Sequence, residues 1–185
     1  SGLVLSRKQA RGDKGQRFGF TNNFIAEWFA TEELRVRAKF GITKYDDTQD
    51  QRLSPEHTDF DDKEATQKGL FKHSLQKYLY YEGDLSATYG KLIAEKHQIN
   101  AVLGFNFNNT TSKTNGYSAT GFTDDQFAAP SFANNYPTGG KPSYRENIKH
   151  ASSFYLNGGY AYDNRYLLDF NLRNDGASMF GTDNR

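Results

Sequence analysis

Apolar and polar residues alternate strictly along the segment 33–43. One parity holds the apolar residues Leu34, Val36, Ala38, Phe40 and Ile42, and the other holds Arg35, Arg37, Lys39, Gly41 and Thr43. Successive side chains of a β-strand point to opposite faces, so this pattern predicts a strand with one apolar and one polar face.

The same alternation recurs along the chain. It predicts strands over about 17–29, 33–47, 74–90, 97–110, 150–162 and 165–178. The connections near residues 31, 93 and 163 are short, whereas about 48–73 and 111–148 are long, polar and without a period. In an up-and-down sheet, this order places the short turns at one end of the strands and the long loops at the other.

Sorted connections are typical of outer-membrane β-barrels, which have short periplasmic turns and long extracellular loops. A Greek-key sandwich has no reason to sort its loops in this way. Aromatic residues that would form a periplasmic girdle lie beside the short turns, namely Trp28, Tyr89, Tyr162 and Tyr166. We therefore predict an all-β fold, an antiparallel up-and-down meander of about six strands that is part of a large transmembrane β-barrel.

Six strands are fewer than the roughly eight of the smallest closed barrels. We therefore expect residues 1–185 to be a partial barrel domain. The chain starts without Met and stops directly after a strand pattern, which also suggests an excised fragment.

The polar parity of the strands carries charges that are costly in a closed soluble core but not around a wet lumen. The candidates for lumen-facing side chains are Arg35, Arg37, Lys39, Glu82, Asp84, Asp169 and Arg173.

Composition agrees with two-faced strands. Apolar residues make up 36% of the chain and aromatic residues 15%, and the mean hydropathy is −0.84. A soluble β-sandwich can have a similar composition, so these values do not decide between the two folds. The net charge of +1 excludes a strongly basic nucleic-acid surface.

No catalytic constellation is visible, so we predict that the protein is not an enzyme and uses no cofactor. The chain has no Cys, and its four histidines, His57, His73, His97 and His150, lack the spacing of metal ligands. An acidic cluster could ligate calcium, but a solvated loop is the simpler interpretation of Asp59, Asp61, Asp62 and Glu64.

The second long loop is the best candidate for recognition, because its aromatic residues lie among Asn, Asp and Gly. These candidates for ligand or partner contact are Tyr117, Phe122, Phe127, Phe132, Tyr136 and Tyr144. The alternative is that the rings pack the loop against its neighbours.

The end of the chain carries a specific motif. Residues 164–181, NRYLLDFNLRNDGASMFG, closely resemble a barrel segment of SusC/RagA-like TonB-dependent transporters, which commonly reads K/R-Y-L-L-x-x-x-x-R-x-D-G-S-S-x-F-G. Ala177 stands where Ser is usual. The order of the preceding segments, including LRVRAKFGI and INAVLGFNF, is also similar.

The resemblance implies a barrel of about 22 strands that is filled by an N-terminal plug. It also implies uptake energised through TonB and a SusD-like surface lipoprotein over the loops. The plug and its TonB-contacting segment have no counterpart in this chain. We therefore expect TonB-dependent import of a glycan oligosaccharide or a peptide across the outer membrane of a Gram-negative bacterium, with the barrel embedded in outer-membrane lipid. The alternative is a soluble secreted β-sheet module for glycan binding or adhesion.

Overall fold

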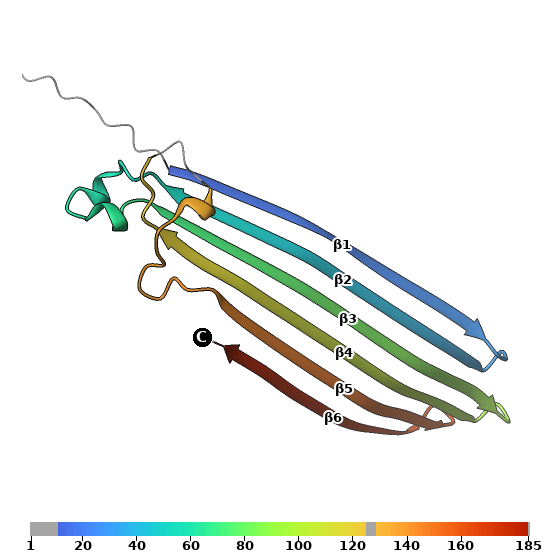
Figure 1. The fold of residues 1–185 in the computed structure, drawn as a ribbon. Helices are drawn as coiled ribbons and strands as arrows, with labels where there is room; N and C mark the ends of the chain where they lie inside the picture. Colours follow the sequence, from blue (N-terminus) through green and yellow to red (C-terminus); the bar gives the residue numbers. More distant parts are fainter. Residues whose placement is uncertain (1–10, 125–128, 185) are drawn as a thin grey trace, which may run out of the picture.

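The computed structural model describes residues 11–124 and 129–184, which form one six-stranded sheet (Figure 1). Each strand pairs antiparallel with the next along the chain. The strands are β1 (Arg11–Phe29), β2 (Leu34–Leu53), β3 (Leu70–Ile93), β4 (His97–Thr120), β5 (Ser143–Tyr162) and β6 (Tyr166–Asn184). The predicted all-β meander is therefore confirmed.

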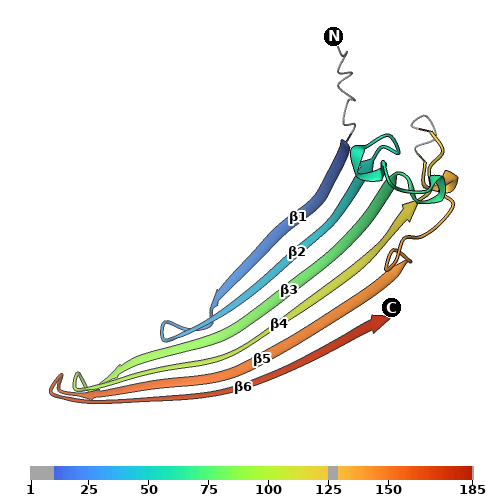
Figure 2. The same ribbon diagram turned by 90° about the vertical axis from the view of Figure 1, so that its left-hand side faces the viewer.

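The short turns lie together at one end of the sheet and the longer connections at the other (Figure 1). Two of the turns have consecutive residues in the left-handed region: Ala94 and Glu95, with φ of 50° and 57°, and Asp163 and Asn164, with φ of 50° and 51°. These residues are the central pair of a tight turn, closed by hydrogen bonds from Lys96 N–H to the Ile93 carbonyl and from Arg165 N–H to the Tyr162 carbonyl. Each connection is three residues long, 94–96 and 163–165, and turns with two left-handed central residues match the twist of the strands that they join. The sheet is bent along its length and forms a curved wall (Figure 2).

The strands are longer at the loop end than the alternation predicts, so the expected loop bounds are wrong. The loops 48–73 and 111–148 shorten to 54–69 and 121–142, because the paired strands continue to Leu53, Leu70, Thr120 and Ser143. Side chains on both faces are largely polar there, so the alternation disappears while the backbone ladder continues. The loops hold three short 3₁₀ helices, Thr58–Phe60, Ala65–Gln67 and Pro130–Phe132.

The described residues form a single layer with almost no apolar core. The buried apolar residues among them are Ala119, Phe122 and Ala161, and large apolar side chains along the strands remain exposed. An isolated layer cannot cover its own apolar face, so a second layer or lipid has to do so.

Candidate functional site: two opposite faces of the sheet

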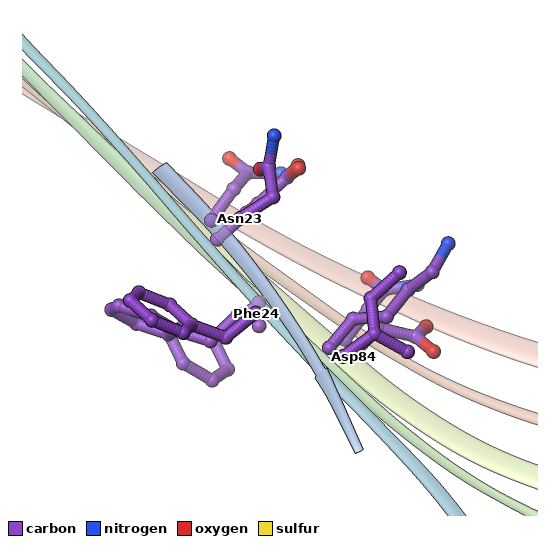
Figure 3. A pocket seen from close by; sticks show the side chains of 12 residues that line it. Asn23, Phe24 and Asp84 are labelled. Atoms are coloured by element: carbon purple, nitrogen blue, oxygen red, sulfur yellow. The ribbon is translucent and has the colours of Figure 1, made fainter. Parts of the chain in front are cut away.

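The strand register gathers apolar side chains on one face. One row of partners crosses the whole sheet and consists of Trp28, Val36, Ala87, Leu103, Leu156 and Leu172. Figure 3 shows Phe24 on this side of the sheet and Asn23 and Asp84 on the opposite side. We call the two sides the apolar face and the polar face.

The apolar stretch of the central strands has the length of a membrane crossing. On β2 it runs from Leu34 to Ile42, and on β4 from Ile99 to Phe107. Each rises about 26 Å along the strand, or about 19 Å along the membrane normal at a tilt of about 45°. This height is close to the apolar band of outer-membrane barrels, which is about 25 Å tall.

The predicted aromatic girdle lies on the apolar face beside the short turns. Tyr162 and Tyr166 are partners in the register, and their ring centroids are 6.4 Å apart. Trp28 is 67% exposed near the turn between β1 and β2. Tyr89 pairs with Leu34 at the same end of the sheet.

All seven predicted lumen candidates share the polar face. On β2 they are Arg35, Arg37 and Lys39, on β3 Glu82 and Asp84, and on β6 Asp169 and Arg173. Neighbouring charges are partly balanced on this face, because Arg37 Nε lies 3.2 Å from Glu27 Oε1 and Arg173 Nε lies 2.9 Å from Asp175 Oδ1. Whether this face lines a lumen remains a prediction.

Sequence reasoning missed an aromatic cluster on the polar face. The rings of Tyr45 and Tyr78 stack with their centroids 4.7 Å apart and their planes at 17°. The Arg17 guanidinium carbon lies 4.3 Å from the centroid of Tyr45. Gly19 pairs with Tyr45, and a Cβ at position 19 would lie 2.6 Å from Tyr45 Cβ. Residues from three strands form this cluster, so no single segment could indicate it.

Sequence reasoning also missed large apolar side chains on the polar face. Ile25, Phe29 and Leu167 lie there and are well exposed. The sequence could have shown this, because the apolar face of β1 and β6 holds even-numbered residues and these three residues have odd numbers.

Two of the six recognition candidates belong to strands, so their assignment to the loop was wrong. Tyr117 lies on β4, and its ring centroid is 5.4 Å from that of His73 and 6.2 Å from that of Phe71. Tyr144 lies on β5 and donates a hydrogen bond to Glu146. The register places both on the same side as the apolar face.

Phe122 packs the loop against its neighbour. It is 4% exposed, and its ring lies over Gly69, where an added Cβ would be 3.0 Å from Phe122 Cδ2. The hydroxyl of Thr120 donates to the carbonyl oxygens of Gln67 and Gly69, which ties the two loops together.

The remaining aromatic candidates divide into exposed and undescribed residues. Phe132 and Tyr136 are 53% and 51% exposed, so both are open to a ligand or partner. Phe127 lies outside the described residues.

Within the described part of the chain, no group of three or more His, Cys, Asp or Glu residues could hold a metal ion. In residues 11–124 and 129–184, none of the helices has the length and apolarity that a membrane crossing requires.

The described residues form a single curved antiparallel sheet with one apolar and one polar face, and its short turns and long loops lie at opposite ends. Solved structures share this fold. The chain matches "Structure of the RagAB peptide transporter" with a TM-score of 0.77 and 19% identity over 92% of its own length and 20% of that chain. The RagAB peptide importer matches in its open-open and closed-closed states, each with a TM-score of 0.77, 20% identity and coverage of 91% of this chain and 18% of that one.

The chain therefore spans about a fifth of the length of these solved structures. No family model and no curated protein matches the sequence. The likeness to these structures agrees with the predicted all-β meander, and the matched structures are described as a transporter and an importer rather than as enzymes.

Proposed function

We propose that this chain is part of the wall of an outer-membrane β-barrel that imports a nutrient. The observation that carries the proposal is the uncovered apolar face, which crosses all six strands. Its height of about 19 Å along the membrane normal is near that of the apolar band of outer-membrane barrels. A contiguous apolar surface of this kind leads to aggregation in water and is stable against lipid.

Closure into a larger barrel would also pair the two outermost strands. In the described sheet β1 pairs with β2 and β6 pairs with β5, so each of the outermost strands has a second edge without a strand partner. Such edges are prone to pair with other chains, and barrel closure removes them. The match to about a fifth of a RagAB chain agrees with this arrangement.

We propose an oligosaccharide or a peptide as the cargo. The polar face has charges of both signs and the stacked rings of Tyr45 and Tyr78, which suit contact with sugar rings or with peptide groups. The matched structures are described as a peptide transporter and a peptide importer, which favours the peptide.

We propose a SusD-like surface lipoprotein as the partner at the loop end, where Phe132 and Tyr136 are exposed. Energy would come from TonB through a plug region that this chain does not contain. The location would be the outer membrane of a Gram-negative bacterium.

The test is to express the complete barrel protein and to follow it through cell fractionation. We expect it in the outer-membrane fraction, with faster gel migration before heating than after, and with uptake of labelled oligopeptides that stops when TonB is deleted. Recovery in the soluble fraction with unchanged migration would instead favour the secreted β-sheet module.

A further inference from the structure

Charged side chains begin on the apolar face directly beyond the apolar band at its loop end. On β2 the apolar run ends at Ile42, and the next two positions on that face are Lys44 and Asp46. Asp46 pairs with Lys77 in the register, and Lys77 pairs with Lys113. Three lysines on three adjacent strands therefore lie along the edge of the band.

One of these lysines is already neutralised. Lys113 Nζ lies 2.9 Å from Glu146 Oε1. Hydrogen bonds from the Tyr144 hydroxyl and from Lys113 hold the pKa of Glu146 below its ordinary value, and the hydrogen bond to Glu146 raises the pKa of Lys113. Both groups are outside the apolar band, and they form a closed pair.

The other two lysines are open to an external anion. Lys44 and Lys77 are exposed, and among the described residues neither takes part in an ion pair. Asp46 is opposite Lys77 in the register, but the two side chains form no ion pair among the described residues. The other register partner of Lys77 is Lys113, whose charge is already paired with Glu146.

The opposite edge of the band differs. Lys91 lies on the apolar face at the turn end, but its Nζ is 3.2 Å from Glu33 Oε1. Aromatic side chains such as Tyr89 and Tyr166 are exposed at that edge. Unpaired positive charge on this face therefore lies at the loop end of the band, among the described residues.

We propose that Lys44 and Lys77 bind the phosphate groups of phosphorylated lipid in the outer leaflet. Lys44 lies two residues beyond Ile42, which is about 5 Å further along the membrane normal and at the level of lipid headgroups. A lysine ammonium binds phosphate as a point charge. This inference rests on the proposed function, because the apolar band must be in a membrane for its edge to meet headgroups.

The experiment measures lipid binding to the complete barrel protein in neutral detergent by native mass spectrometry. The probe is diphosphoryl lipid A, compared with its dephosphorylated form. The test variant is Lys44→Gln/Lys77→Gln. The matched control, Lys72→Gln/Lys149→Gln, removes two exposed lysines from the polar face.

We expect the test variant to bind diphosphoryl lipid A more weakly by about fivefold for each lysine removed, because one basic residue near an anionic lipid surface contributes about that factor. The control variant should bind as the unmodified protein does. Lys44→Arg/Lys77→Arg should restore binding, and the dephosphorylated lipid should bind all variants equally weakly.

Equal affinity of the test variant and the unmodified protein would overturn the inference, as would equal binding of both lipid forms. Complete displacement of the lipid by inorganic phosphate would show a free-anion site and would also overturn it. Heat-modifiable migration of each variant verifies that its barrel is folded. If the unmodified protein is absent from the outer membrane, the proposed function fails as well. If the protein is in the outer membrane but its binding of diphosphoryl lipid A does not depend on Lys44 and Lys77, only this inference fails.

Discussion

An arginine at position 103 tests which face of the sheet meets lipid. Leu103 lies midway along the apolar stretch of β4, between Ile99 and Phe107, and its side chain is 44% exposed. Its register partners are Ala87 on β3 and Leu156 on β5, so an arginine there would have apolar neighbours on both sides.

The depth of Leu103 sets the magnitude. Each end of the stretch is about 13 Å away along the strand, or about 9 Å along the membrane normal at a tilt of about 45°. A cation at the midplane of a barrel's lipid face costs about 2–4 kcal/mol, and this cost falls to about 0–1 kcal/mol near the interface. We therefore expect Leu103→Arg to lower the free energy of unfolding by about 3 kcal/mol, and Thr111→Arg, on the same face beyond the band, by less than about 1 kcal/mol.

The assay is reversible urea unfolding of the complete barrel in lipid vesicles, followed by tryptophan fluorescence and by heat-modifiable migration. Val102→Arg is the matched control, because Val102 is the adjacent residue on the polar face, opposite Thr88 and Asn157. Val102 is half-buried between these polar neighbours, so we expect the control to lower stability by about 1 kcal/mol or less. Equal losses for Leu103→Arg and Val102→Arg would refute the assignment of the faces.

Two further substitutions test packing within the sheet and the loops. Gly83→Ala should lower the free energy of unfolding in urea by about 1–3 kcal/mol, because the added Cβ would lie 2.3 Å from Phe107 Cε1. Gly176→Ala is the control and should change it little, because the nearest atom to its added Cβ is 3.8 Å away. Equal losses of stability for the two variants would show that the Phe107 ring moves aside freely. Phe122→Ala should speed proteolysis of residues 121–142, because truncating a buried Phe costs about 3–5 kcal/mol. Tyr136→Ala, which changes an exposed side chain of the same loop, should leave the cleavage rate unchanged, and equal acceleration by both would mean that Tyr136 packs the loop as well.

The alternation of the sequence reports the surroundings of the two faces more directly than it reports strand pairing. Where one face is apolar, as from Leu34 to Ile42, the pattern predicts the strand and its orientation correctly. Beyond Asp47 both faces are polar and the period disappears, although β2 continues to Leu53. The predicted strands therefore correspond to the parts of the strands that have one apolar and one polar face, and a two-face pattern cannot show the strand ends beyond them.

Register could be predicted across the short turns but not across the long loops. Tyr162 and Tyr166 share the apolar parity, so the short connection between them is the three residues 163–165, and every later pair of β5 and β6 follows from the pair Tyr162 and Tyr166. A long loop, residues 54–69, joins β2 to β3 and does not fix their register. The sequence requires only that the apolar positions of the two strands share a face, and all registers that differ by steps of two residues meet this requirement. The stacking of Tyr45 on Tyr78 depends on that choice, because a shift by two residues would separate the rings. A side-chain cluster between strands that a long loop joins is therefore visible only after the strands have been paired, whereas the face on which it lies can be assigned beforehand.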